Sequence, residues 1–373
     1  MDFGLSEEQE QLRESARHFL AGECPARKMR EIALDAAGLS PELERKMAQL
    51  GWPGLIVPER FGGAGLGMLD MAVLLEECGY AAMPGPFLFS SAIAAYALAA
   101  GGGDEINTRW LRPLASGDAT GAVAIVEAND GLAPSDFAAT ARTAPAGAVI
   151  NGMKMFVPYA QSASFFIVAA RTGAGARDVG LFVVPANAAG VKIRPLKALD
   201  LTRRLALVEF DGVLAPPEAQ LRGGADLYER VLSAGAIAIA ADSIGGAQRV
   251  LDMAVEYAKV REQFGKPIGS FQAIKHAAAE IVADLEPARA LVWYAAYAFD
   301  ALPRDAARAA AMAKARACDV YSRAAGKAVL MHGGIGFTWE HDIHFWFKRA
   351  RLNESLFGAP PYHRERVAAL GGY

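Results

Sequence analysis

One twelve-residue stretch of this chain carries an unusual set of chemical groups. Residues 261–272 read Arg-Glu-Gln-Phe-Gly-Lys-Pro-Ile-Gly-Ser-Phe-Gln, so an arginine, two glutamines and two phenylalanines lie close together. A guanidinium pairs well with phosphate, aromatic rings pack on rings, and amides bond to hydroxyls or base edges. The set suits a large flat ligand with an anionic linker. An ordinary helical hairpin with polar ends is the alternative interpretation.

The residues on either side predict the elements that hold this stretch. From residue 226 to 259 apolar residues recur at three- and four-residue spacing, which is the pattern of an amphipathic helix. Residues 273–299 follow the same pattern. Gly265, Pro267 and Gly269 break it, so we expect a short turn between two long antiparallel helices.

The order of these twelve residues resembles the signature of the acyl-CoA dehydrogenase family. In that family the turn lies at a subunit interface and helps to hold FAD that is bound mainly by the neighbouring subunit. The resemblance therefore implies FAD contacts for Arg261, Gln263, Phe264, Phe271 and Gln272. It also implies a homodimer, a homotetramer or an α2β2 heterotetramer.

Composition argues against several other classes of protein. The 373 residues carry a net charge of only −3, so no basic footprint for nucleic acid is present. The uncharged run 83–103 contains prolines and closing glycines, which favours a buried helix over a membrane span. The N-terminus is rich in charged residues, unlike a secretory signal. The three cysteines have no metal-binding spacing, which favours a reduced, cytoplasmic compartment.

The chain divides into three segments of different texture. Residues 1–117 read as helical, with a capping box from Ser6 to Gln9 and further helices at 41–50 and 69–79. Residues 118–222 hold short β-branched and aromatic runs between turn residues, which predicts a β domain. The runs are 122–127, 148–151, 154–158, 164–170, 179–185, 191–195 and 206–210. Residues 223–373 read as helical again.

This order of segments extends the resemblance over nearly the whole chain. Acyl-CoA dehydrogenases have a β domain between two helical domains. The implied fold class is α+β, with an N-terminal helical domain, a central β-sandwich or barrel and a C-terminal four-helix bundle.

Three further stretches resemble family motifs with departures. The glycine-rich loop 50–65 resembles one near the substrate channel, and a loop with no ligand role is its alternative. In residues 152–160, Phe156 takes the aromatic position beside the flavin, although Pro158 replaces the usual threonine. The alternative for Phe156 is an ordinary core aromatic. Residues 331–342 resemble the turn at the FAD adenosine and pyrophosphate, which implies contacts for Gly333 and Gly334. Residues 126–130 match the family's flavin loop poorly, and Leu330 replaces a common glutamine.

The catalytic base of the family is missing from both of its usual positions. In the family a carboxylate removes the α-proton of an acyl-CoA while hydride leaves the β-carbon for the flavin. The position before the glycine of the last motif holds Phe357, and the alternative position on the helix before the turn holds Gly235.

Asp242 is the remaining candidate for the base. It is the only ionisable residue between Arg230 and Arg249, and a lone carboxylate in so apolar a helix is costly to bury unless it is paired. We expect Asp242 to act as the base. The alternative is an aspartate paired to an arginine or hydrogen-bonded to a neighbouring helix. Glu354 is a weaker candidate, with a salt bridge to a nearby arginine as its alternative role.

Three functions follow from these observations. The first is FAD-dependent dehydrogenation of an acyl-CoA, with electrons passed to an electron-transfer flavoprotein. The motifs of this chain resemble those of enzymes for bulky, branched or cyclic acyl groups, including steroid-derived ones. The second is a catalytically silent, FAD-holding subunit of a heteromeric dehydrogenase, which the two missing bases favour. The third is a fold reused for hydration or elimination without net redox.

Overall fold

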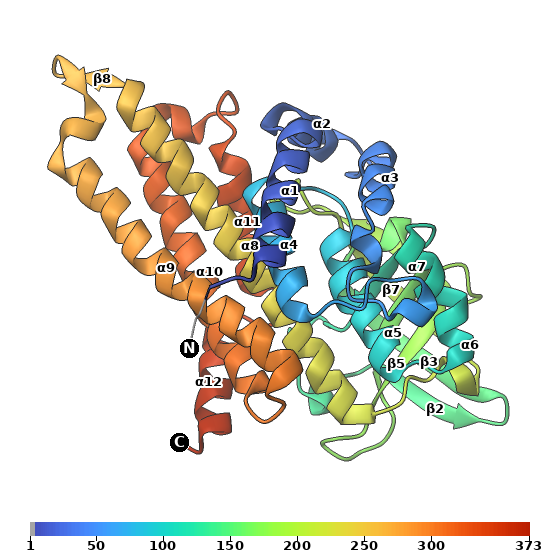
Figure 1. Ribbon diagram of the computed structural model, residues 1–373. Helices are drawn as coiled ribbons and strands as arrows, with labels where there is room; N and C mark the ends of the chain where they lie inside the picture. The colour runs from blue at the N-terminus through green and yellow to red at the C-terminus, as the bar shows by residue number, and fades with distance from the viewer. Residues whose placement is uncertain (1–3) are drawn as a thin grey trace.

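Helices from both ends of the chain flank a curled central sheet in the computed structural model, which describes residues 4–373 (Figure 1). The N-terminal helices α1–α7 precede the sheet, strands β1–β7 form it, and helices α8–α12 follow it. The α+β fold class predicted from the sequence is confirmed. The boundaries 1–117, 118–222 and 223–373 remain predictions.

Helices α1, α3 and α4 begin within one residue of where the sequence predicts them, whereas α2, α6 and α7 were not predicted. The Ser6 hydroxyl accepts a hydrogen bond from the Gln9 N–H, and the Gln9 side chain accepts one from the Ser6 N–H, so the predicted capping box is present. The uncharged run 83–103 forms a buried π-helical segment at Leu88–Ala94 followed by α5. The helices are α1 (Glu7–Glu23), α2 (Ala26–Leu34), α3 (Pro41–Gln49), α4 (Met68–Tyr80), α5 (Ala95–Gly101), α6 (Asp104–Ile106) and α7 (Arg112–Ser116).

The sheet has seven strands, and most of the predicted runs form part of it. Its order is β1-β4-β2-β3-β7-β6, with β5 paired to β4. The β1–β4 pair is parallel, whereas β4–β5, β2–β3, β3–β7 and β6–β7 are antiparallel. The strands are β1 (Gly121–Ala124), β2 (Thr140–Ala144), β3 (Gly147–Pro158), β4 (Phe165–Arg171), β5 (Val179–Pro185), β6 (Val191–Leu196) and β7 (Leu205–Ala215).

Two details of the sheet differ from the sequence prediction. The runs 148–151 and 154–158 form one strand, β3, because irregularities at Gly152 and at Met155–Phe156 shift the register without ending the pairing with β7. Strand β2 was not predicted. Its Thr-Ala-Arg-Thr-Ala sequence has no apolar run, and pairing with β3 holds it in the sheet.

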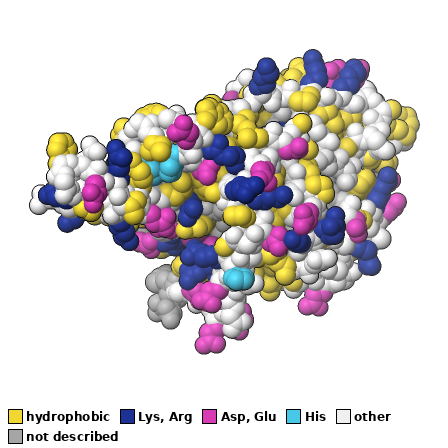
Figure 2. Space-filling model, turned by 90° about the horizontal axis from the view of Figure 1, so that it is seen from above, with side chains coloured by type: hydrophobic (Ala, Val, Ile, Leu, Met, Phe, Trp, Pro, Cys, Tyr) yellow, Lys and Arg dark blue, Asp and Glu magenta, His cyan; other side chains and the backbone are white. Residues whose placement is uncertain are grey.

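The C-terminal helices form a bundle with a long projecting arm. The predicted helices are α8 (Gly224–Val260), α9 (Gln272–Ala301) and α10 (Ala306–His332), and α11 (Ile343–Ser355) and α12 (Pro360–Gly371) follow. The ends of α8 and α9 carry the short strands β8 (Glu262–Gln263) and β9 (Lys266–Pro267) to a tip far from the sheet (Figure 1). Seen from above, hydrophobic and charged side chains mix along this arm (Figure 2). Although α8 is long and apolar enough to cross a membrane, its most apolar stretch is 94% buried inside the protein.

Helices α4 and α8 cross with their backbones in direct contact. A Cβ atom at Gly79 would lie 2.0 Å from the carbonyl oxygen of Asp242, and one at Gly245 would lie 1.7 Å from that of Glu76. Both distances are far shorter than a nonbonded contact. The two glycines therefore set how closely α8 approaches the N-terminal helices.

We expect Gly245→Ala to destabilise the protein by about 1–3 kcal/mol or more, because the new methyl group meets backbone that cannot rotate away. The measurement is the free energy of unfolding in urea. Gly326→Ala is the matched control: this glycine lies within α10 with no atom near the added Cβ. It should gain about 0.5–1 kcal/mol from helix propensity. A Gly245→Ala protein as stable as the parent would contradict the close crossing.

Candidate active site

The tip of the arm presents its aromatic side chains to solvent. Phe264 is 91% exposed and has a left-handed backbone φ of 53°. Its ring meets that of Phe271 edge to face at 6.0 Å between centroids, and the Lys266 ammonium lies 4.6 Å from the Phe271 ring centre. An exposed phenyl ring on a strained turn typically marks a contact surface.

The polar groups of the same tip are available to a ligand. Within residues 4–373, no carboxylate lies within ion-pair distance of Arg261. The Gln263 side-chain amide donates only to the neighbouring Glu262 carbonyl, at 2.8 Å. Gln272 begins α9 and is exposed. The predicted turn between antiparallel helices is confirmed, and its cofactor contacts remain a proposal.

The glycine turn after α10 packs beside the helical turn that leads into Arg261. Helix α10 ends at His332, and Gly333 leaves it with a φ of 65°. The His332 ring stacks on Tyr257 with centroids 4.6 Å apart, and the Tyr257 carbonyl accepts a hydrogen bond from the Arg261 N–H at 2.9 Å. The structure thus brings Gly333 and Gly334 near the base of the arm.

The two flanks of the glycine turn make different contacts. Asp342 bridges to Arg30, whose Nε donates to the carboxylate at 2.7 Å. Leu330, which stands where the family often has glutamine, is 71% exposed. Its side chain offers no polar contact there.

On the sheet, a bulge turns Phe156 outward. The register of β3 against β7 shifts between Lys154 and Val157, and Phe156 takes a φ of 54° within this irregularity. The ring is 43% exposed. The interpretation of Phe156 as an ordinary core aromatic is therefore wrong. Bulges commonly aim a side chain at a functional site.

A buried ion pair behind Phe156 anchors the loop 126–130. The Lys154 ammonium lies 2.7 Å from the Glu127 carboxylate and also donates to the Ile125 carbonyl at 2.9 Å. Glu127 accepts two more hydrogen bonds from the main-chain N–H groups of residues 138 and 139. Burial lowers the pKa of Lys154 to about 8, with Glu127 opposing that effect. This pair was not predicted from the sequence, and its only sequence signal is that Lys154 is the one charged residue of β3.

Gly235 and Phe357, the two positions at which the family resemblance implies a base, face each other. A Cβ atom at Gly235 would lie 2.3 Å from the ring of Phe357, so the phenyl group fills the space next to this part of α8. The cavity beside that contact, lined by Leu132 and Tyr362 among others, has a volume of about 10 Å³. This is about the space of one water molecule.

Main-chain contacts hold Phe357 in place. The residue has a φ of 56°, a conformation that L-amino acids rarely adopt. The fully buried Lys314 donates to the carbonyls of Gly358 at 2.7 Å and of Glu354 at 3.3 Å. The His363 ring nitrogen lies 2.8 Å from the Phe357 carbonyl. Burial lowers the pKa of Lys314.

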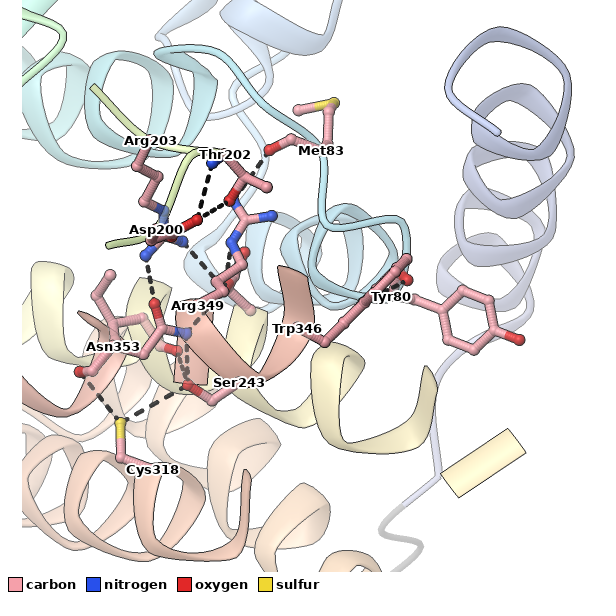
Figure 3. Close-up of polar contacts among 12 residues, drawn as sticks. Tyr80, Met83, Asp200, Thr202, Arg203, Ser243, Cys318, Trp346, Arg349 and Asn353 are labelled. Carbon is pink, nitrogen blue, oxygen red and sulfur yellow. Dashed lines mark hydrogen bonds and ion pairs between the residues drawn. The ribbon is translucent and has the colours of Figure 1, made fainter. Parts of the chain in front are cut away.

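Asp242 lies in a buried cluster of charged groups, the Asp242 cluster, which also comprises Arg203, Arg349 and Asn353. One carboxylate oxygen of Asp242 lies 3.0 Å from an Arg203 nitrogen, 3.5 Å from Arg349 Nε and 2.8 Å from the Asn353 amide nitrogen. All four side chains are at most 3% exposed. Figure 3 shows these partners converging on α8 beside Ser243.

The Asp242 cluster connects all three segments of the chain. Arg203 comes from the loop before β7 and also donates to the Asn353 side chain. Arg349 on α11 donates to the Met83 carbonyl, in the N-terminal part, at 2.9 Å. Asp200, which lies close to the cluster, is also buried and accepts hydrogen bonds from the main-chain N–H and the hydroxyl of Thr202. The geometry favours the second interpretation of Asp242, an acid paired to arginines.

Neither Glu354 nor Asp242 is placed to act as a base at the Gly235–Phe357 contact. Glu354 forms a partly exposed ion pair with Arg351 at 3.2 Å, which is its structural role. Asp242 lies seven residues beyond Gly235 on α8, about 10 Å further along the axis. The structure therefore brings no unpaired carboxylate of this set to the Gly235–Phe357 contact.

The two predicted halves of the cofactor site lie apart. Strand β3, which carries Phe156, and the arm tip, which carries Arg261, lie on opposite sides of the molecule (Figure 1). One chain therefore cannot bring these two sets of side chains around a single ligand.

Comparison with known proteins gives a consistent identity. Three family models match in chain order: the acyl-CoA dehydrogenase N-terminal domain at residues 6–118, the middle domain at 122–212 and the C-terminal domain at 222–371. They leave only short linkers and ends unmatched.

Individual relatives match over almost their full lengths. The chain is 34% identical over 366 residues to the acyl-CoA dehydrogenase IpdE2 of Mycolicibacterium smegmatis, covering 98% of this chain and 99% of the relative. It is 29% identical to the caffeyl-CoA reductase-Etf complex subunit CarC of Acetobacterium woodii, covering 93% and 94%. A chain of the ChsE4-ChsE5 complex from Mycobacterium tuberculosis superposes with a TM-score of 0.92 at 29% identity, covering 100% and 99%. The chain therefore belongs to the acyl-CoA dehydrogenase family of FAD-dependent oxidoreductases.

Proposed function

We propose that this chain is the base-free, FAD-holding subunit of a heteromeric dehydrogenase that oxidises an acyl-CoA thioester between its α- and β-carbons. The observation that carries the proposal is the Phe357 ring packed against Gly235. Both positions at which the family places its carboxylate are filled by this one contact. A partner chain of the same family, with its own carboxylate, supplies the missing base.

The space around Phe357 supports this proposal. Removal of an α-proton needs a carboxylate within hydrogen-bond reach of the substrate, and the acyl group needs room beside it. The cavity at Phe357 holds about 10 Å³, too little for even a short acyl chain. This small volume supports the proposal that substrate turns over in the partner.

The arm residues fit the partner's cofactor. Arg261 has no acidic partner within the described part of the chain and is exposed, which suits a diphosphate. Phe264 and Phe271 offer ring faces, and Gln263 and Gln272 offer amides. Gly333 and Gly334 line the approach from the neighbouring turn. When bound, FAD supplies the acceptor for the hydride that leaves the β-carbon.

The sheet side fits a flavin less well. Phe156 is exposed on its bulge and suits a flat ring. Pro158 provides no hydroxyl, and the carboxylate of Glu127 is occupied by Lys154 and two N–H groups. The side chains of the arm therefore suit the partner's FAD better than the side chains of the sheet suit an FAD bound by this chain itself.

The relatives support a heteromeric assembly and name its class of electron acceptor. The similar ChsE4-ChsE5 structure is a complex of two differently named proteins, and CarC is named as a subunit of an Etf complex. We propose an electron-transfer flavoprotein as the acceptor and a bulky acyl-CoA, including steroid-derived ones, as the substrate. The free, buried Cys24, Cys78 and Cys318 suit a reducing cytoplasm.

A homo-oligomeric enzyme with Asp242 as its base is the second candidate. One observation favours it: the Asp242 Oδ1 atom has no hydrogen-bond partner among the described residues. Its other oxygen is held by Arg203, Arg349 and Asn353. The carboxylate also lies about 10 Å along α8 from the Gly235–Phe357 contact.

The first test compares the chain alone with the chain co-purified with a base-bearing partner. Flavin absorbance is followed during anaerobic addition of straight, branched and cyclic acyl-CoAs. We expect no bleaching of the chain alone and bleaching of the complex. Stoichiometric bleaching of the isolated chain by any of these thioesters would refute the base-free assignment.

The second prediction concerns the arm. We expect Arg261→Gln to weaken FAD binding to the complex about tenfold to hundredfold, because a hydrogen bond to a charged group contributes about 1.5–3 kcal/mol. The measurement is FAD affinity by fluorescence titration of the flavin-depleted complex. Arg304→Gln is the control and should bind FAD normally, because Arg304 is an exposed arginine in the turn between α9 and α10 with no ion-pair partner among residues 4–373. Equal affinities for the two variants would remove Arg261 from the cofactor site.

The third prediction separates the two roles of Asp242. Replacing it by asparagine leaves Arg203 and Arg349 buried without their counter-charge, so we expect a loss of about 3–5 kcal/mol in unfolding free energy. The rate of flavin bleaching by acyl-CoA in the folded complex should stay within about twofold. A bleaching rate lowered a hundredfold at normal stability and flavin content would instead identify Asp242 as the base.

A further inference from the structure

A second cavity lies away from both parts of the proposed cofactor site. It has a volume of about 230 Å³ and forms where the C-terminal ends of α1 and α4 meet α8 and α11. Leu20 and Cys24 line it from α1, Tyr80 and Ala81 from α4 and its end, and Trp346 from α11. It shares no lining residue with the small cavity at Phe357.

One guanidinium in this cavity has donors to spare. The Arg249 guanidinium carbon lies 5.3 Å from the Tyr80 ring centre and 5.8 Å from that of Trp346. Its one hydrogen bond from a side-chain nitrogen runs to the Tyr80 hydroxyl at 3.3 Å. Within residues 4–373, no carboxylate lies within ion-pair distance of it. An arginine held between two rings is oriented, and its remaining N–H groups can meet a ligand.

The other polar groups that line the cavity are neutralised or hydrogen-bonded within the protein, or carry no charge. Arg17 at the rim is held by two hydrogen bonds to Glu77, at 2.8 and 2.9 Å. Burial raises the pKa of Cys24 to about 12, so its thiol carries no negative charge at neutral pH. The Trp346 indole N–H donates to the Tyr80 carbonyl at 3.1 Å.

One acid lies behind the Tyr80 hydroxyl. Asp252 accepts from that hydroxyl at 2.9 Å and from the Gln248 amide at 2.8 Å. Both of its oxygens are therefore engaged with neutral donors, and neither pairs with Arg249. Of the two arginines that line this cavity, Arg17 is neutralised by Glu77, whereas Arg249 has no carboxylate partner among residues 4–373.

We propose that this cavity binds a small carboxylate with an apolar body. The carboxylate would pair with Arg249, and the body would pack against Leu20, Ala81 and Trp346. An apolar cavity of about 150 Å³ is enough for benzene, so 230 Å³ suits a ring or short chain that bears one carboxylate. Coenzyme A is far too large for this space. The ligand class is therefore a free acid and not a thioester.

The test is a calorimetric titration of the purified protein with benzoate, using benzamide as the uncharged analogue of the same shape. We expect saturable binding of one benzoate with a dissociation constant of about 1 mM or tighter, which is typical of a small ligand with one ion pair. Benzamide should bind at least tenfold more weakly. Crystals soaked in benzoate should show it against Arg249 and Trp346.

Two variants make the test specific. Arg249→Gln should weaken benzoate binding at least tenfold, and Arg304→Gln, another arginine without an ion-pair partner in the described chain, should bind like the parent. Thermal unfolding confirms that both variants are folded. The absence of saturable binding up to about 20 mM benzoate, well above the expected dissociation constant, would overturn the proposal. So would equal affinity for benzoate and benzamide, or an Arg249→Gln protein that binds normally.

Discussion

The Asp242 cluster determines how the parts of this chain fit together. Two arginines, an aspartate and an asparagine meet where almost no solvent reaches, and buried charges are tolerated only when each is paired and hydrogen-bonded. Asn353 is 111 residues from Asp242 and 150 residues from Arg203 in the sequence. The pairing is complete only when the sheet, α8 and α11 are all in place. The cluster therefore favours a single relative position of these elements over others of similar compactness.

That position has a direct consequence for the vacated active site. Helix α11 carries Asn353 and ends two residues before Phe357. With Asn353 fixed by the cluster and Lys314 bonded to the carbonyls on either side, Phe357 has little freedom to leave Gly235. A left-handed φ at a bulky residue costs roughly 1–3 kcal/mol, and these surrounding contacts offset it. The contact between Phe357 and Gly235 is thus a stable part of the fold.

The sequence predicted most of what is local and little of what is tertiary. Helix periodicity, the Ser6–Gln9 capping box and the glycine turns are encoded within a few residues, and the corresponding elements form where predicted. Strand β2 was missed because only its neighbours hold it in the sheet. The lone Asp242 indicated a buried acid correctly, but its arginine partners are distant in sequence and no local pattern identifies them. The bulge that exposes Phe156 is likewise a product of pairing between β3 and β7.

The shape of the chain also bears on the kind of oligomer it forms. The arm and strand β3, which carries Phe156, lie on opposite sides of the molecule (Figure 1), so one chain cannot bring both surfaces around one cofactor. A symmetric pair of identical chains would do so, but each copy would also carry Phe357 against Gly235 and the same paired Asp242. Symmetry repeats what a chain contains and cannot supply a group that every copy lacks. If the arm serves a dehydrogenase, the base has to come from a chain of different sequence, and the asymmetry of the complex follows from the loss of one carboxylate.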